Sequence, residues 1–180
     1  MKGHDALWTY MSMGPFVEFS GFSEWVALRA NDKNTQTYAI FDVKDVAVGV
    51  AVLMEVRPAM RVCEVGGILY APALQRTPLG TEAQYLLARY AFETLGYRRY
   101  EWKCNALNAP SRAAALRYGF MFEGILRAHM VFKGRNRDTA YFSMLEDEWP
   151  ARKAAFEKWL RPENFDTDGK QKKKLEELRT

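Results

Sequence analysis

Residues Val65–Gly80, VGGILYAPALQRTPLG, followed directly by residues 81–96, TEAQYLLARYAFETLG, decide the fold of this chain. The first stretch is typical of a short apolar strand that runs into a loop, and the second is typical of an amphipathic helix that ends at Gly96. Thr81 and Gln84 fit a capping box, which predicts that the helix begins at Thr81. The first N–H groups of a helix have no partner within it and lie at the positive end of its dipole. This strand–loop–helix unit is therefore suited to bind a phosphate group.

The chain before this unit predicts one helix and three strands. Apolar residues recur at spacings of three and four between Phe16 and Ala30, which indicates an amphipathic helix. Residues Tyr38–Val43 and Val46–Arg57 predict two strands joined by a short polar turn, and Arg61–Tyr70 predicts a third. Strands joined by tight turns are expected to pair in an antiparallel manner.

The chain after the unit continues with alternating elements. Tyr100, Trp102 and Cys104 alternate with basic residues and with Glu101, which predicts a half-buried strand with a solvated Glu101. The remaining predicted elements are a helix capped by Asn108 and ended by Gly119, a hairpin of Phe122–Lys133 with Arg137–Leu145, and a last helix over Glu148–Leu160. The order predicts an α/β fold: a mixed, mostly antiparallel sheet with one parallel crossover around residues 62–104 and helices on both faces.

Composition limits the classes of protein that this chain can belong to. Its 180 residues, 48% hydrophobic and 27% charged, predict a single domain over residues 1–161 and a polar, mobile tail over 162–180. No apolar run is long enough to span a membrane, and the N-terminus has no secretory pattern. Cys63 and Cys104 have no partner at metal-ligand spacing, which predicts reduced thiols, no metal site and a cytoplasmic protein. The net charge is +4, and the lysines of the tail are by themselves weak evidence for nucleic-acid binding.

The residues in the loops resemble those of the GNAT acetyltransferases, most closely the ribosomal-protein N-acetyltransferase branch. The family signature Q/R-x-x-G-x-G/A, at the junction of its fourth strand and third helix, matches Gln75–Gly80, with Pro78 in place of the first glycine. Other matches in the same order are Thr81-Glu82-Ala83, Asn108-x-x-Ser111, Arg117-Tyr118-Gly119-Phe120, and the hairpin Gly134–Asp138 that runs into Tyr141–Met144. The resemblance extends over Tyr38–Trp149.

The resemblance implies acetyl-CoA as the cosubstrate. In this family the signature loop holds the pyrophosphate, which implies binding by Gln75, Arg76, Thr77, Gly80 and Thr81. It also implies that the backbone of Ile68, Leu69 and Tyr70 holds the thioester and the pantetheine arm, with Asn108 and Ser111 beside them. Because Pro78 has no N–H, one backbone donor of the family is missing here.

Acetyl transfer to an amine needs a base, and the sequence offers two candidates. Glu64 lies in the fourth strand, where several family members place a catalytic carboxylate, and alternation puts it on the same face as Ile68 and Tyr70. The alternative is a surface or salt-bridged carboxylate, paired with Arg61 or with a neighbouring strand. His129 is the other candidate, because an ordinary histidine pKa suits proton transfer, and the alternative is an ordinary strand histidine.

Ser111 is the candidate for protonating the leaving thiolate, since Ala115 stands where many family members carry a tyrosine. The alternative is a solvated serine in the first turn of a helix. The leading hypothesis is an N-acetyltransferase that acts on a peptide N-terminus or a small amine by direct attack. The other is a non-catalytic CoA-binding module of the same fold.

The usual first strand of the family is expected to be missing, which leaves an open sheet edge. A second copy of the chain, a rearranged N-terminus or a longer chain would account for it.

Overall fold

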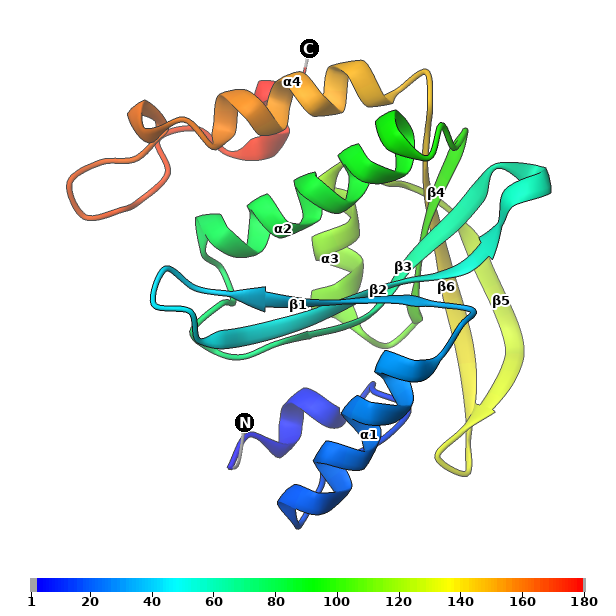
Figure 1. Ribbon diagram of the computed structural model, residues 1–180. Helices are drawn as coiled ribbons and strands as arrows, with labels where there is room; N and C mark the ends of the chain where they lie inside the picture. Colours follow the sequence, from blue (N-terminus) through cyan, green and yellow to red (C-terminus); the bar gives the residue numbers. More distant parts are fainter. Residues whose placement is uncertain (1–2, 180) are drawn as a thin grey trace.

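A six-stranded sheet forms the centre of the computed structural model, which describes residues 3–179 (Figure 1). The strands are ordered β1-β2-β3-β4-β6-β5. Their bounds are β1 Gln36–Phe41, β2 Ala47–Arg57, β3 Val62–Tyr70, β4 Arg99–Asn105, β5 Met121–Phe132 and β6 Arg135–Leu145. β3 and β4 pair in parallel, and every other pair of neighbours is antiparallel. The predicted mixed, mostly antiparallel sheet is confirmed.

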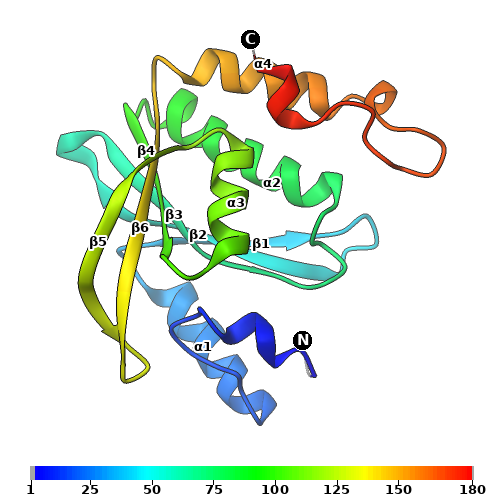
Figure 2. The same cartoon turned by 180° about the vertical axis from the view of Figure 1, so that it is seen from behind.

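Helices cover both faces of the sheet, as predicted. α1 (Phe19–Asn31) lies on one face, and α2 (Pro78–Arg89), α3 (Ala109–Tyr118) and α4 (Trp149–Trp159) lie on the other (Figure 2). α2 continues into a π-helical turn over Tyr90–Thr94. None of the helices in the described part of the chain has the length and apolarity that crossing a bilayer requires.

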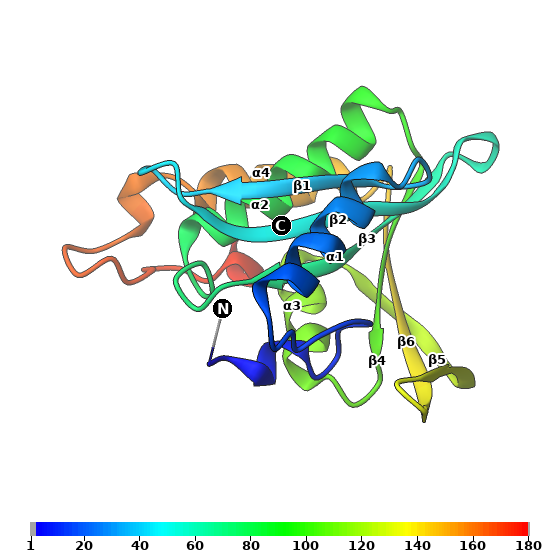
Figure 3. The same cartoon turned by 60° about the horizontal axis from the view of Figure 1, so that its bottom comes forward.

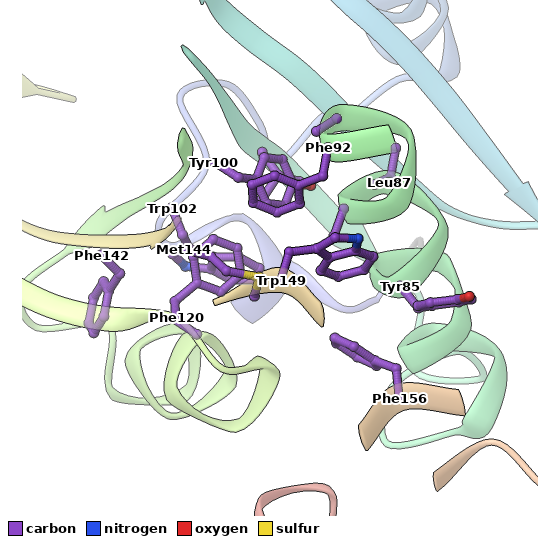
Figure 4. Packing of buried hydrophobic residues seen from close by; sticks show 14 of the residues in the cluster. Tyr85, Leu87, Phe92, Tyr100, Trp102, Phe120, Phe142, Met144, Trp149 and Phe156 are labelled. Carbon is purple, nitrogen blue, oxygen red and sulfur yellow. The ribbon is translucent and has the colours of Figure 1, made fainter. Parts of the chain in front are cut away.

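The main core lies between the sheet and the three helices α2, α3 and α4 (Figure 4). Phe92, in the π-helical turn after α2, stacks on Trp149 of α4, with ring centroids 5.2 Å apart, and packs edge-on against Tyr100 of β4. Tyr100, Trp102 and Phe156 are all at most 5% exposed. Burying one large apolar side chain stabilises a fold by about 1.5–3 kcal/mol, so the apolar face of β4 holds the three helices on the sheet.

Two helices begin at other residues than the sequence predicts. α1 begins at Phe19 rather than Phe16. α2 begins at Pro78, with Thr77 as its N-cap, so the predicted capping box at Thr81 is wrong. Proline is favoured in the first turn because it needs no hydrogen-bond partner there, and Thr81 is instead a buried residue within the helix.

The sheet ends in an open edge at β1. No strand precedes α1 within residues 3–179, as predicted, and β1 carries no charged residue. Hollows of about 440 and 590 Å³ flank β1, the first beside Tyr38 and α2 and the second beside Ala39 and α1. A second copy of the chain covering this edge stays a prediction.

The segment after α4 packs on the domain, whereas the sequence predicts a mobile tail. Leu175 is 1% exposed and belongs to the main core. Asn164 Nδ2 donates hydrogen bonds to the carbonyls of Trp159 and Lys173, and Arg179 Nη1 donates one to the Leu116 carbonyl. These contacts hold residues 162–179 against α3 and α4.

Candidate active site

The loop between β3 and α2 leaves backbone N–H groups open to a ligand. Thr77 Oγ1 accepts a hydrogen bond from the Gly80 N–H (3.2 Å) and donates one to the Leu74 carbonyl (2.7 Å). Arg76, directly before the N-cap, has a left-handed backbone with φ of 60° and an exposed side chain. Within residues 3–179, no protein group accepts a hydrogen bond from the N–H of Arg76 or Thr77. At the positive end of α2, these groups are suited to bind an anion.

A half-buried tyrosine packs against this loop. Tyr70 Oη donates a hydrogen bond to the Gly80 carbonyl (3.2 Å) and accepts one from Gln84 Nε2 (2.7 Å). Burial raises the pKa of Tyr70 well above its ordinary value, so the hydroxyl keeps its proton. A Cβ on Gly80 would lie 2.8 Å from the Leu74 carbonyl oxygen and 3.3 Å from the Tyr70 ring. Glycine therefore lets the start of α2 approach the strand end, while Gln75 Nε2 holds the Tyr70 carbonyl at 2.9 Å.

β3 and β4 separate beside this loop. Val62–Val65 of β3 pair with Arg99–Trp102 of β4, and beyond Val65 the two strands diverge (Figure 3). The unpaired part of β3 contains Gly67, with φ of 55°, followed by Ile68 and Leu69. The backbone of Ile68, Leu69 and Tyr70 is the part of β3 that the sequence predicts to hold a thioester. The separation leaves that backbone without a partner strand on the β4 side.

Asn108 and Ser111 lie at the start of α3. Asn108 is the N-cap, as predicted, and its Oδ1 accepts a hydrogen bond from the Ser111 N–H (3.2 Å). Ser111 Oγ accepts one from Trp102 Nε1 (3.0 Å). Ser111 is thus half-buried and held against the core, with its oxygen acting as the acceptor toward Trp102.

Glu64 is buried and paired with a neighbouring strand. It is 6% exposed, and its Oε2 lies 2.9 Å from Lys103 Nζ of β4. Arg61 pairs with Glu146 instead. Burial raises the pKa of Glu64 and Lys103 opposes that effect, with a net value above the ordinary one. A raised pKa brings a carboxylate closer to the range in which it can take a proton from an amine.

The prediction that Glu64 shares a face with Ile68 and Tyr70 is wrong. The register of β3 with β2 shifts between Val50 and Val52, where Gly67 has its positive φ. A bulge adds one residue and reverses the alternation beyond it. Ile68 therefore packs against the main core, and Glu64 lies on the other face of the sheet, as does Leu69.

Glu101 is buried, so the predicted solvated position is wrong. It is 5% exposed, and its oxygens lie 2.7 Å from Arg99 Nε, 2.8 Å from Arg57 Nη2 and 3.0 Å from Lys103 Nζ. Burial by itself would raise its pKa, but the hydrogen bonds from Arg99 and Lys103 hold the pKa of Glu101 below its ordinary value. Arg99 also binds Glu123, which extends the charged network to β5.

His129 lies apart from Glu64, on an exposed stretch of β5. Its Nδ1 is 3.0 Å from Thr139 Oγ1, and its Nε2 is 3.5 Å from Tyr141 Oη. The Tyr141 ring also lies 5.0 Å from Lys103 Nζ. The structure thus places Glu64 and His129 on either side of the Lys103–Tyr141 contact, whereas Ser111 binds Trp102 on the core side.

A second, smaller aromatic cluster lies under α1. Trp8 is 3% exposed and packs edge-on against Phe16, Phe22 and Trp25, with Leu69 of β3 beneath. Trp8 and Trp25 are buried core residues of this cluster. The N-terminal segment is therefore attached to the same stretch of β3 that borders the opening.

Sequence reasoning missed two residues at this site, the half-buried Lys103 and the buried Gln84. The sequence around Lys103 gives no signal that its side chain is partly buried. Its position depends on the ion pair with Glu64, which is far away in the sequence and lies on the neighbouring strand β3. Gln84 was assigned to a capping box, although it is 3% exposed and bonded to Tyr70. Within residues 3–179 no group of side chains could hold a metal ion.

Comparisons with known proteins point to one family. A family model described as the acetyltransferase (GNAT) domain matches residues 4–121. A curated protein of Bacillus subtilis (strain 168), YdaF, is provisionally named a ribosomal N-acetyltransferase. It is 37% identical over 73 residues, a stretch that covers 41% of this chain and 40% of that protein.

Solved structures agree with this assignment. The crystal structure of a GCN5-related N-acetyltransferase from Brucella melitensis is 46% identical, with a TM-score of 0.97 over 99% of this chain and 81% of that one. A spermidine N-acetyltransferase from Vibrio cholerae in complex with CoA and spermine is 19% identical, with a TM-score of 0.67 over 82% of this chain and 86% of that one. At that identity it shows a shared fold alone.

Proposed function

Because this chain belongs to the GNAT acetyltransferase family, we propose that it transfers the acetyl group of acetyl-CoA to a primary amine by direct attack. The acceptor is a peptide N-terminus or a small amine. The single observation that supports this most is the buried carboxylate of Glu64, with its raised pKa, beside the opening between β3 and β4. A cytoplasmic location is part of the proposal, and the buried free thiols of Cys63 and Cys104 support it.

The loop before α2 fits the pyrophosphate of acetyl-CoA. The open N–H groups of Arg76 and Thr77 and the close approach at Gly80 offer the donors and the space that a phosphate needs. Thr81, at the first turn of α2, accepts a hydrogen bond from Arg117 Nη1 (3.1 Å), which adds positive charge nearby. The loop keeps this character without the N–H that Pro78 lacks.

Acetyl-CoA supplies the acetyl group as a thioester, and the residues of the chain position the reactants and move protons. We assign Glu64 to accept the proton that the amine gives up. The backbone of Ile68, Leu69 and Tyr70, which does not pair with β4, would hold the thioester region. Asn108 would bind the pantetheine arm with its side-chain amide, and Ser111 would give its hydroxyl proton to the leaving sulfur. His129 is the alternative base, at an exposed position farther along the sheet.

Two measurements test the proposal. Titration calorimetry with acetyl-CoA should show saturable binding, and absence of binding at high micromolar ligand would contradict it. Release of free thiol should then be followed with peptides that differ in their first residue and with polyamines such as spermidine. Glu64→Gln should lower turnover with the best acceptor at least tenfold while leaving acetyl-CoA binding in place.

The second candidate function is a CoA-binding module without catalysis. Ala115 in place of a tyrosine, the engaged Ser111 oxygen and the proline in the loop support it. Such a module would bind acetyl-CoA and release no thiol above background with any amine.

A further inference from the structure

Two buried carboxylates lie side by side on β3 and β4. Glu64 and Glu101 are direct register partners, and they are 6% and 5% exposed. Two such groups cannot both stay ionised in a buried position unless cations compensate them, and otherwise one of them takes up a proton. Glu101 has three cations, from Arg57, Arg99 and Lys103. In the described part of the chain, Glu64 has a single ion pair, with Lys103.

Lys103 is held between the two carboxylates. Its Nζ lies 2.9 Å from Glu64 Oε2 and 3.0 Å from Glu101 Oε2, and the Tyr141 ring lies 5.0 Å from it. Burial by itself would lower the pKa of Lys103, but the two carboxylates hold that pKa above its ordinary value. The ammonium therefore stays charged, in a place fixed by β3, β4 and β6.

This contact also orients Glu64. Oε2 faces Lys103, while Oε1 lies against Gly66, 3.3 Å from the point that a Cβ on Gly66 would occupy. Gly66 is the first residue of β3 beyond the part that pairs with β4. The second oxygen of Glu64 thus lies near Gly66, beside Met54 of β2, at the point where the pairing of β3 with β4 ends.

We propose that Lys103 is a positioning residue for Glu64, which it keeps ionised and turned so that Oε1 lies at the point where the pairing of β3 with β4 ends. This inference rests on the proposed role of Glu64 as the base. The other charged or titratable groups around the pair are Glu55 and Arg57 of β2, Arg99 and Glu101 of β4, Glu123 of β5 and Tyr141 of β6. When Lys103 is removed, Glu101 keeps its ion pairs with two arginines, whereas Glu64 loses its one ion pair in the described part of the chain. The removal should therefore affect the ionisation and orientation of Glu64 more than those of Glu101.

The test compares Lys103→Met with Lys103→Arg in the full chain. Lys153→Met, which removes a lysine from the pair with Glu93 on the surface, is the matched control. The acid limb of kcat/KM against pH, with the best amine of the panel, should move to higher pH by about one unit or more in Lys103→Met. It should stay near the wild-type position in Lys103→Arg and in the control. Acetyl-CoA binding by calorimetry should remain within about twofold in all variants, because Lys103 does not touch the loop.

A second readout does not depend on turnover. Carbon-13 NMR of the glutamate carboxyl groups, with the Glu64 signal assigned by Glu64→Gln, should show that Glu64 titrates at higher pH in Lys103→Met than in the wild type. An unchanged Glu64 titration would overturn the inference. If Lys103→Met does not fold, a double variant with Lys103→Met and Glu101→Gln removes the repulsion between the two carboxylates. Its Glu64 titration is then compared with that of Glu101→Gln alone. If the titration moves but Glu64→Gln leaves turnover intact, the positioning stands and the proposed base is wrong.

Discussion

Thr77 holds the loop before α2, which is the proposed pyrophosphate site, to the start of that helix, so its replacement by valine should destabilise both. Valine keeps the volume and removes Oγ1, which accepts from the Gly80 N–H and donates to the Leu74 carbonyl. Loss of an N-cap costs about 0.5–2 kcal/mol, and an unpaired, partly buried carbonyl adds about 1 kcal/mol. The free energy of unfolding should fall by about 1.5–3 kcal/mol, which lowers Tm by about 3–12 °C in a chain of this length.

Thermal unfolding followed by circular dichroism measures the effect, with Thr77→Ser as the matched control because serine keeps the hydroxyl. Calorimetry with acetyl-CoA should show weaker binding by Thr77→Val than by Thr77→Ser, since a loosened loop must be ordered when the ligand binds. A Thr77→Val protein that melts within about 1 °C of the wild type and binds acetyl-CoA equally well would refute the reasoning.

Four further predictions concern the core, the thiols, acid stability and the open edge. Leu175→Ala should cost about 2–5 kcal/mol in urea unfolding, because Leu175 is 1% exposed, and a cost near zero would indicate a mobile segment instead. Burial raises the pKa of Cys63 to about 12, so a thiol reagent at pH 8 should modify it only after unfolding, and fast modification of the folded protein would contradict this. The hydrogen bond from Arg99 holds the pKa of Glu123 below its ordinary value, so Glu123 contributes stability that is present above a pH of about 4.3 and is lost as the pH falls further. In urea unfolding at a series of pH values, Glu123→Gln should therefore lose less stability on acidification than the wild type. An equal loss in both proteins would contradict a stabilising pair of Arg99 and Glu123. If a second copy covers β1, light scattering should give a dimer that Ala39→Lys converts to a monomer, and a wild-type monomer at all concentrations would exclude this interface.

The local elements of this fold could be predicted because their signals lie within short stretches. Alternation in Tyr100–Cys104 indicates a strand whatever the rest of the chain does, and Asn108 with Gly119 marks the ends of α3. Segments of this kind also carried the resemblance to the family, since its motifs are contiguous. Even so, the start of α2 was displaced by three residues, because Pro78 and Thr77 together made an earlier N-cap than Thr81.

Three other positions that sequence reasoning placed wrongly depend on contacts between distant segments. Glu64 changed face because a bulge at Gly67 reversed the alternation, and a bulge is set by the register with β2. Glu101 became buried because Glu64 lies opposite it on β3 and Arg57 reaches it from β2. Leu175 joined the core because α3 and α4 offered it an apolar surface.

By itself, the sequence determined the strands, the helices, the family and the loop before α2, since each is encoded by neighbouring residues. Tertiary structure alone decided the environment of the proposed base: the face on which Glu64 lies, the single cation beside it and the direction of its free oxygen. The physical reason is that charge compensation and burial are properties of residues brought together by sheet pairing, and Lys103 meets Glu64 only because β3 and β4 run parallel in one particular register.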